Sequence, residues 1–391
     1  MRFFFGVFPS LVSKIKCLSG IYIHIPFCRR ACDYCDFHFS TSLQLKSKTV
    51  DAICAELQLR ALKWQSEPVN TIYFGGGTPS LLNSGELTQI MQAVKKNYPI
   101  GNEPEITFEA NPDDINEDAL KTWISAGINR LSIGVQSFIN RDLQYMERIH
   151  DARLAEDAVK MAQQAGISNI TIDLIYGTPG MSDTEWEANL RKAVGLNVPH
   201  ISAYALTVED KTPLFHRIRK KQKAAPDESA TADQFLFMVS FLAQHGYQQY
   251  EVSNFAKPGL ESRHNSAYWE GVPYLGIGPS AHSFDGFRRR MNIANNARYI
   301  QAFEKNELNY FEEEVLTEDD RYNEYLLTRL RTRKGLVKED FEKHFSPGEW
   351  VALLEELDEL PESFLSVTED AISLSTEGLL HADGIASELF R

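Results

Sequence analysis

The chain has 391 residues, a formal net charge of −14 and a hydrophobic content of 43%. At about 150 residues per domain, this length predicts about two domains with ordinary hydrophobic cores. The acidic balance argues against a nucleic-acid partner, which would need clustered lysine and arginine. No apolar run reaches the roughly 20 residues that span a bilayer, so we do not expect an integral membrane protein.

Residues 1–20 form an N-terminal extension that contains three basic residues and no acidic residue. This composition is weakly similar to that of an organelle presequence. A leftover segment or an alternative translation start explains it as well, and we prefer that explanation. The five cysteines of the chain are few and odd in number, which fits a reducing compartment and predicts a cytoplasmic location.

Short β-branched runs alternate with helical patterns over the first part of the chain. This alternation is typical of repeated βα units, an α/β class with a parallel sheet. Six such units predict a partial (β/α)6 barrel in a core domain over 21–245. The expected strands are 21–25, 69–74, 105–109, 129–135, 169–175 and 200–207. The expected helices are 43–64, 85–97, 116–126, 153–165, 183–194 and 231–245.

The remaining region, 246–391, divides by composition into two parts. The polar stretch 216–230 that precedes it reads as an exposed connector. The segment 246–310 is rich in aromatic residues and glycine, and we expect it to cover the barrel. The segment 311–391 predicts a mainly helical, winged-helix-like module. Its expected elements are helices near 319–333, 337–344 and 348–358 and a β-hairpin at 364–374.

Three thiols, Cys28, Cys32 and Cys35, follow the first predicted strand at a spacing of C-x3-C-x2-C. A [4Fe–4S] cluster normally has four thiolate ligands, so a compact trio leaves one iron open for another molecule. A structural zinc site would need a fourth ligand nearby, for which His24 and His38 are the available imidazoles. The cluster is the stronger interpretation, and Cys54 reads as a small buried hydrophobe.

Polar residues follow several of the other predicted strands. Ligands of parallel α/β folds gather at the carboxyl ends of the strands, so these residues are candidates for binding a cofactor. The first is the turn Gly75–Pro79, where glycine allows a ligand to approach the backbone closely. The others are Glu109, Gln136, Arg148 and Asp173. Taken singly, each of these four residues reads as a cap or a surface charge.

Together, these motifs resemble those of the radical S-adenosylmethionine (SAM) superfamily, and within it the HemN/HemW family named for the oxygen-independent coproporphyrinogen III oxidase. The matching strings are IYIHIPFC, FGGGTPS, EANPD, SIGVQSF, ERIHD, IDLIYGTPG and YLGIGPSAHS. The resemblance implies a [4Fe–4S] cluster whose open iron chelates SAM. It also implies that an electron from the cluster splits the sulfonium of SAM, so that the cofactor supplies the difficult chemistry.

The resemblance assigns individual residues to one or two bound SAM molecules. For a first SAM it implies Tyr22, Gly76 and Glu109. For a second SAM, a feature of the oxidase, it implies Tyr34, Gly77, Thr78, Gln136, Arg148 and Asp173. The chemistry is suitable, because a carboxylate attracts an ammonium or sulfonium and an arginine pairs with a carboxylate.

Phe37 decides between the two branches of this family. The oxidase motif continues C-x3-C-x2-C-x-C, whereas this chain reads Cys35-Asp36-Phe37, and Phe37 cannot supply the further thiol. The oxidases also carry a longer N-terminal arm than the 27 residues that precede Cys28. Both differences favour the HemW branch, whose members are regarded as haem chaperones.

A second motif, H-N-x-x-Y-W, resembles the string associated with haem binding in that branch. It consists here of His264, Asn265, Tyr268 and Trp269. A histidine can ligate haem iron, and aromatic rings can flank a porphyrin. The motif could equally lock a buried corner of the fold. The other imidazoles considered as ligands are His24, His150, His200 and His282.

The resemblance therefore predicts a haem chaperone that uses a [4Fe–4S] cluster and SAM. Its implied partners are haem, an electron donor and a haem-accepting protein, which family membership suggests is a membrane haemoprotein of the respiratory chain. The alternative is an enzyme, the coproporphyrinogen III oxidase, which decarboxylates two propionates with the adenosyl radical. A weaker third interpretation is a radical enzyme with another substrate.

Overall fold

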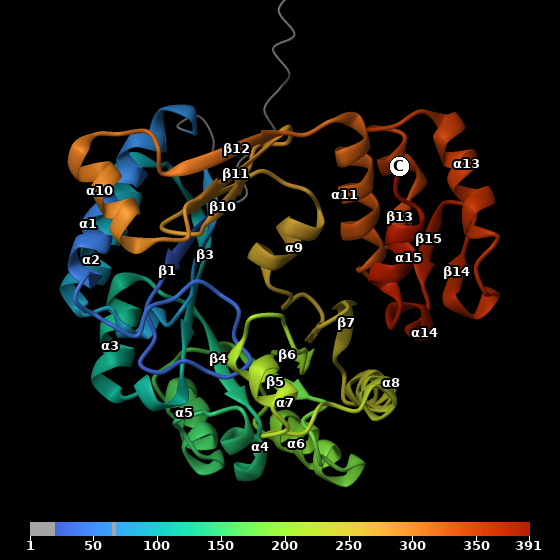
Figure 1. Cartoon of the computed structure of the whole chain (residues 1–391), viewed down its shortest axis with the longest axis horizontal. Helices are drawn as coiled ribbons and strands as arrows, with labels where there is room; N and C mark the ends of the chain where they lie inside the picture. The colour runs from blue at the N-terminus through green and yellow to red at the C-terminus, as the bar shows by residue number, and fades with distance from the viewer. Residues whose placement is uncertain (1–19, 65–67) are drawn as a thin grey trace, which may run out of the picture.

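The computed structural model describes residues 20–64 and 68–391. The expected extension over 1–20 therefore lies outside the described residues, except for Gly20. Within these ranges, the main sheet has twelve strands in the order β12-β11-β10-β9-β1-β2-β3-β4-β5-β6-β8-β7. Figure 1 shows this sheet curving around a central space, with helices along its outside.

Six parallel strands form the centre of the sheet, as the sequence predicts. Each pairs in parallel with its successor along the chain, which is the pairing that βα units produce. The α/β class and the partial barrel are thereby confirmed. The six strands are β1 (Gly20–Ile25), β2 (Val69–Gly76), β3 (Ile100–Ala110), β4 (Arg130–Gln136), β5 (Asn169–Tyr176) and β6 (His200–Ala205).

Helices between these strands cover the outer face of the sheet (Figure 1). Several begin at the capping residues that the sequence offers. Asn83 and Glu86 form a capping box at α2, and Ser182 and Glu185 form another at α6. The helices are α1 (Lys46–Arg60), α2 (Ser84–Asn97), α3 (Glu117–Ala126), α4 (Asn140–Tyr145), α5 (Ala152–Gln164), α6 (Asp183–Gly195) and α8 (Glu228–Gln244).

The central strands are apolar on one face and polar on the other. In β5, Ile170 and Ile172 are fully buried in the core, whereas Thr171 and Asp173 line a cavity inside the barrel. Strands of a parallel sheet usually read as nearly continuous hydrophobic runs because both faces are buried in apolar surroundings. The alternation here means that the inside of the barrel is a polar site.

Strands from the second half of the chain extend the sheet at both edges. The segment 246–310, which its composition predicts to cover the barrel, contributes strands β7 to β11 to the sheet, with β9 parallel to β1. The sequence does not reveal this pairing, because the strands are short and their alternation is too brief. The added elements are β7 (Gln248–Glu251), β8 (Asn254–Ala256), α9 (Arg263–Trp269), β9 (Tyr274–Ile277), β10 (His282–Phe284), β11 (Arg288–Asn292), α10 (Asn296–Lys305) and β12 (Phe311–Val315).

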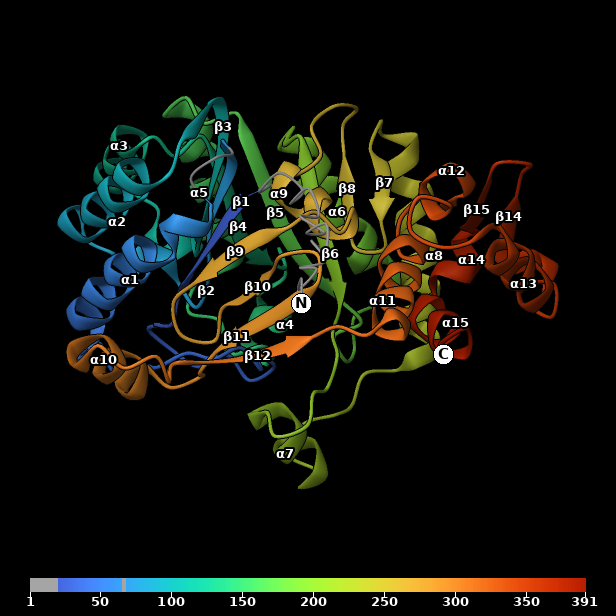
Figure 2. The same ribbon diagram turned by 90° about the horizontal axis from the view of Figure 1, so that it is seen from above.

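The stretch 216–230 is more than the exposed connector that its polarity predicted. Helix α7 (Pro213–Arg219) precedes and enters it, and Figure 2 shows this helix projecting from the body of the molecule. Leu214 at its start is buried, and the Leu214 N–H donates to Asp33 O at 2.9 Å. Arg217 and Lys223 both form ion pairs with the Asp33 carboxylate. Charge pairing therefore holds this segment against the cysteine loop.

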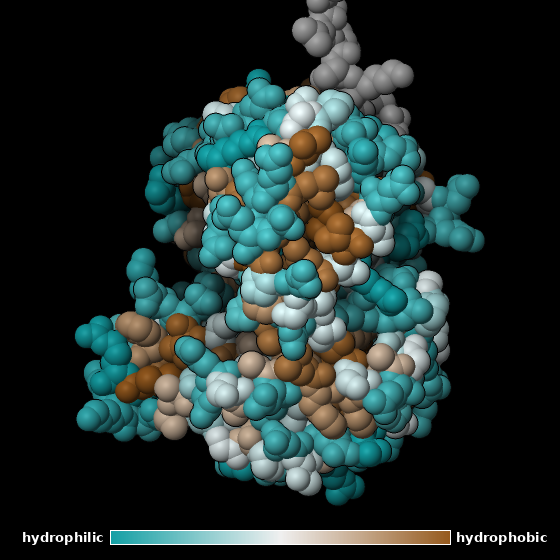
Figure 3. All heavy atoms as spheres, turned by 90° about the vertical axis from the view of Figure 1, so that its right-hand side faces the viewer, coloured by the Kyte–Doolittle hydropathy of each residue, from teal (hydrophilic) through white to brown (hydrophobic). Residues whose placement is uncertain are grey.

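The C-terminal module combines helices with a three-stranded antiparallel sheet of order β13-β15-β14. It docks on the barrel through backbone bonds: the Val252 N–H donates to Arg331 O at 3.0 Å, and the Arg333 N–H donates to Tyr250 O at 3.1 Å. Figure 3 views the molecule from the side of this module and shows hydrophobic areas among polar ones. The elements are α11 (Glu318–Leu330), β13 (Leu336–Val337), α12 (Lys338–Phe341), α13 (Pro347–Leu357), β14 (Leu365–Val367), β15 (Ala371–Leu374), α14 (Thr376–Leu379) and α15 (Ala382–Glu388). None of the described helices is both long enough and apolar enough to cross a membrane.

Candidate functional site

The three cysteines lie in the loop between β1 and α1, which the glycine turn after β2 holds in place. The Gly77 N–H donates to Ile25 O at 3.0 Å, and the Thr78 N–H donates to Phe27 O at 2.7 Å. Farther along the loop, Arg29 forms an ion pair with Asp114 at 2.8 Å. A loop without regular secondary structure is thus fixed at several points.

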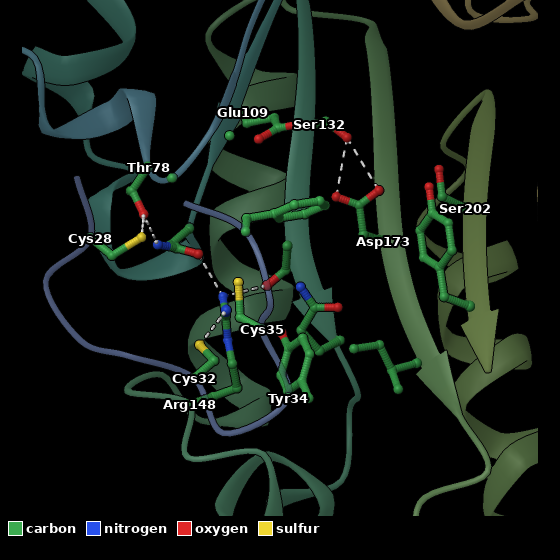
Figure 4. Close-up of a pocket in the computed structure, with 18 of the residues that line it drawn as sticks. Cys28, Cys32, Tyr34, Cys35, Thr78, Glu109, Ser132, Arg148, Asp173 and Ser202 are labelled. Carbon is green, nitrogen blue, oxygen red and sulfur yellow. Dashed lines mark hydrogen bonds between the residues drawn. The ribbon is translucent and has the colours of Figure 1, made fainter. Parts of the chain in front are cut away.

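All three thiols line one cavity of about 470 Å³ inside the barrel, which we call the thiol cavity. Figure 4 shows their sulfur atoms near Thr78 and Arg148, with Glu109 on β3 and Asp173 on β5. Thr78 Oγ1 donates to Cys28 Sγ at 3.4 Å, and Arg148 Nη1 donates to Cys32 Sγ at the same distance.

The donor chemistry of this loop fits an iron–sulfur cluster. Cys28, Cys32 and Cys35 are free and half-buried, and thiolates are soft ligands that suit iron–sulfur clusters. Burial raises the pKa of Cys28 to about 11 and that of Cys35 to about 12. Iron must therefore displace a proton from each of these thiols. The half-buried Arg148 places its positive charge beside Cys32.

The glycines of the turn allow close packing within the protein, apart from any contact with a ligand. Gly76 has a left-handed φ of +97°, and a Cβ there would lie 2.3 Å from the His24 ring. A Cβ on Gly77 would lie 2.6 Å from Ile25 O. Both residues line the thiol cavity, but the close approach that demands glycine is that of the neighbouring strand and loop.

Two carboxylates, Glu109 and Asp173, line the thiol cavity from the strands of the barrel. Burial raises the pKa of Glu109 to about 7 and that of Asp173 to about 6, and the Asp173 carboxylate also raises the pKa of Glu109. Tyr73 OH donates to Glu109 Oε1 at 2.8 Å, and Ser132 Oγ donates to Asp173 Oδ2 at 3.1 Å. A cationic ligand between them would favour their ionised forms.

Arg148 connects the thiols with the strand ends. Its Nη2 donates to Asn111 Oδ1 at 2.6 Å and to Gly134 O at 3.1 Å, and Asn111 Nδ2 donates to Thr78 Oγ1 at 3.3 Å. The resemblance assigns Arg148 to a second SAM, and this assignment stays a prediction. In the structure its hydrogen bonds go to Cys32, Asn111 and the backbone.

The other residues assigned to SAM occupy two different places. Gln136 and Tyr34 line the thiol cavity, and Gln136 adopts a φ of +66°, a strained conformation for a residue other than glycine. Tyr22 lies apart from them. Its ring packs 6.0 Å from that of Tyr73, centroid to centroid, and it lines a second cavity.

This second cavity, of about 650 Å³, is rich in rings, and we call it the aromatic cavity. Asp36 and Phe37 line both cavities, so the two spaces meet at the end of the cysteine loop. Phe37 is 65% exposed. The residue that distinguished the two branches of the family therefore stands between the two cavities.

The residues of the H-N-x-x-Y-W motif lie in different parts of the site. His264 is only 2% exposed, and both of its ring nitrogens have partners: Nδ1 with Thr71 Oγ1 at 2.7 Å and Nε2 with Tyr268 OH at 2.9 Å. It lines neither cavity, whereas Asn265 lines the thiol cavity and Tyr268 and Trp269 line the aromatic cavity. The structure favours His264 as the lock of a buried corner and not as an iron ligand, because its lone pair is already engaged.

Several residues of the site are not among those that the sequence predicts. Arg130 is 1% exposed and donates to Thr171 Oγ1 at 2.5 Å, while Glu105 accepts hydrogen bonds from the first N–H groups of α9. Further cavity-lining residues of this kind are Tyr73, Asn111, Ser132, Ser202 and Tyr204. The signal was present, because most of these side chains occupy the polar positions of alternating strands and Asn111 belongs to the NPD motif.

Comparison with known proteins agrees with this site. Residues 22–193 match the Radical SAM superfamily. The structure is similar to that of coproporphyrinogen III oxidase (HemN) from Escherichia coli, described as a radical SAM enzyme, with a TM-score of 0.81 and 25% identity, covering 95% of this chain and 90% of that chain. The barrel and its cysteine loop thus define a radical SAM protein.

Comparison with individual relatives identifies a narrower family within this superfamily. A protein of Mycobacterium tuberculosis (strain H37Rv) named heme chaperone HemW is 38% identical over 321 residues, which cover 81% of this chain and 82% of the relative. The protein of the same name from Escherichia coli (strain K12) is 34% identical over 384 residues, covering 96% and 99%. The chain belongs to the HemW family, which confirms the resemblance drawn from its motifs.

Proposed function

We propose that this protein is a haem chaperone, which binds haem and passes it to a haem-requiring protein. The observation that carries the proposal is the pair of cavities that meet at Asp36 and Phe37. One is lined by the three thiols and by carboxylates that include Glu109 and Asp173. The other is lined by aromatic and histidine side chains among others and is large enough to take much of a flat macrocycle. The name of the HemW relatives supports the same assignment.

In this proposal Cys28, Cys32 and Cys35 hold a [4Fe–4S] cluster, and the rest of the thiol cavity takes SAM. When bound, the cluster supplies the electron that radical SAM proteins use to split the sulfonium of SAM. Glu109 attracts the positively charged part of SAM, and Asp173 accepts hydrogen bonds from its hydroxyl or amine groups. Arg148 fixes the loop by holding Cys32 and Asn111. The cavity can be tested for one or two SAM molecules by equilibrium dialysis.

The proposed partners are an electron donor for the cluster and a haem acceptor. Family membership favours a membrane haemoprotein of the respiratory chain as the acceptor, and the sparse cysteines favour action in the cytoplasm. The hydrophobic areas beside the C-terminal module in Figure 3 are compatible with a protein partner.

A hemin titration with and without reconstituted cluster tests the proposal. A chaperone should show a saturable Soret change with about one hemin per chain and should release that hemin to an apo-haemoprotein. If neither form of the protein gives a saturable change, haem binding is refuted.

The likeness to the E. coli oxidase favours a second candidate function, the oxidative decarboxylation of coproporphyrinogen III. Phe37 at the position of the oxidase's further cysteine argues against it. An anaerobic assay of the cluster-loaded protein with SAM, a reductant and coproporphyrinogen separates the two functions. Formation of protoporphyrinogen over many turnovers would overturn the purely chaperone role, whereas hemin transfer without turnover would support it.

A further inference from the structure

The aromatic cavity has the volume and the lining that a porphyrin would need. Its lining includes residues of β1, β9, β10, β11, the end of α9, α11 and the cysteine loop. Figure 1 shows where these elements lie. Tyr268 and Tyr274 pack edge to face with centroids 4.5 Å apart. The other rings that line it include Tyr22, Phe37, Phe284, Phe287, Tyr325 and Phe345. Flat apolar walls of this kind suit the two faces of a tetrapyrrole.

Four imidazoles line this cavity, and they differ in whether a ring nitrogen is free for iron. His24 uses both nitrogens, Nδ1 with Tyr22 OH at 3.1 Å and Nε2 with His38 O at 2.9 Å. His38 uses Nε2 with Asn296 Oδ1 at 2.8 Å. His344 contacts the ring of Tyr325. Among the described residues, one imidazole of the four makes neither a hydrogen bond nor a ring contact.

That side chain is His282, in β10. Among the described residues it has no hydrogen-bond or ion-pair partner, and it is exposed on the strand while lining the cavity. Residues two apart on a strand point to the same face, and Phe284, two residues later, lines the same cavity. Partial burial and the nearby Arg289 lower the pKa of His282, which favours the neutral imidazole whose lone pair iron needs.

Three arginines line this cavity, and they differ in whether a carboxylate is paired with them. Arg289 is paired with Glu324, and Arg329 is paired with Asp340. Arg321 lies beside the Phe287 ring, 5.8 Å from its centroid, and has no carboxylate partner among the described residues. Haem carries two anionic propionates, and arginine pairs well with carboxylates.

We propose that the aromatic cavity is the haem-binding site, with His282 as the axial ligand of the iron and Arg321 as the partner of a propionate. This inference rests on the proposed haem-chaperone function and assigns its ligand site. His264 then acts as a positioning residue, because its Nε2 hydrogen bond holds Tyr268 in the cavity wall. The shared lining residues Asp36 and Phe37 bring the bound haem next to the cysteine loop.

Hemin titrations of the full-length protein test the ligand. His282→Ala should raise the dissociation constant for hemin by about tenfold or more and should abolish the spectrum of histidine-ligated haem. Added imidazole should restore that spectrum in His282→Gly. His344→Ala and His38→Ala are matched controls from the same cavity and should retain the spectrum. Because the His282 side chain makes no hydrogen bond in the described structure, circular dichroism should show that its variants fold.

Arg321 is tested with two forms of the ligand. Arg321→Gln should weaken hemin binding by about tenfold but should not change the affinity for hemin dimethyl ester, which lacks the charged propionates. Equal affinities of the wild type and Arg321→Gln for hemin would refute the propionate contact.

The outcomes separate this inference from the proposed function. Saturable hemin binding by the wild type, with affinity and spectrum unchanged in His282→Ala, would overturn the ligand assignment and leave the chaperone function standing. Loss of the histidine spectrum in a control variant instead of in His282→Ala would likewise overturn the ligand assignment and leave the chaperone function standing. No saturable hemin binding by the wild type would refute both.

Discussion

At the scale of single residues, the thiol cavity depends on groups whose charge responds to what binds beside them. Cys32 is the thiol that contacts the buried guanidinium of Arg148. We expect Cys32→Ser to lose most of the iron and sulfide of the reconstituted protein, because serine is a poor ligand for a [4Fe–4S] cluster. Cys54→Ser, a matched thiol change in α1 outside the loop, should retain both. Unchanged iron and sulfide in Cys32→Ser would contradict the cluster assignment.

Glu109 gives a second prediction at this scale. With a pKa of about 7, this carboxyl is ionised above neutrality and protonated below it, and only the ionised form attracts a cation. The affinity for SAM should therefore fall about tenfold between about pH 8 and about pH 6. Isothermal titration at both pH values measures this change. Glu109→Gln should bind weakly with little pH dependence, whereas Glu103→Gln, an exposed change on the same strand, should behave like the wild type.

At the scale of elements, α9 is fixed to the barrel by polar contacts at its first turn. Glu105 accepts from the N–H groups of Arg263 and His264 at 3.1 and 3.0 Å. These contacts satisfy donors that a helix start otherwise leaves free. The His264 side chain adds bonds to Thr71 on β2 and to Tyr268. The motif that suggested haem ligation thus fastens one helix to one strand.

We accordingly expect His264→Ala to lower the free energy of unfolding by about 1–3 kcal/mol, the cost of leaving buried hydrogen-bond partners unsatisfied. Urea unfolding of the wild type and the variant measures this difference. The spectrum of histidine-ligated haem should survive in the variant with weaker binding, because Tyr268 is no longer held. A variant of native stability that lost this spectrum would show that His264 is the ligand after all.

At the scale of the whole molecule, the aromatic cavity exists because the C-terminal module docks on the barrel. Arg329 of α11 is central to this contact: it donates to the carbonyl oxygens of Trp269 and Glu270 and pairs with Asp340 at 3.0 Å. One side chain therefore ties the end of α9 to two helices of the module. The module completes the wall of a cavity whose other side is the sheet.

Arg329→Gln should loosen this contact and lower the free energy of unfolding by about 2 kcal/mol, since a charge-assisted hydrogen bond contributes on this order. Amide hydrogen exchange in α9 and in β7 should become faster, and hemin should dissociate faster. Arg333→Gln is a suitable control, because the Arg333 side chain is exposed. Unchanged exchange in α9 would show that Arg329 does not hold the module.

The fold could be predicted in its parallel centre but not at its edges. The six central strands and most of their helices are long and periodic, so local sequence is sufficient to place them. Strands β7 to β12 have three to five residues each, which is too short for a pattern to identify their neighbours. Their pairing depends on partners distant in the chain, such as β9 on β1.

By itself, the sequence determined the chemistry of this protein: the cysteine spacing, the glycine turn and the polar strand ends identify the superfamily, and Phe37 identifies the branch. These are local patterns, and local geometry fixes what they can bind. Only the tertiary structure decided which side chains are free to act. In the structure both ring nitrogens of His264 are hydrogen-bonded in the protein interior, and Arg148 contacts Cys32. His282 lies beside the aromatic cavity without a hydrogen-bond partner among the described residues. Hydrogen bonds between residues remote in the chain determine which of these side chains are engaged. Such bonds cannot be recognised from the sequence.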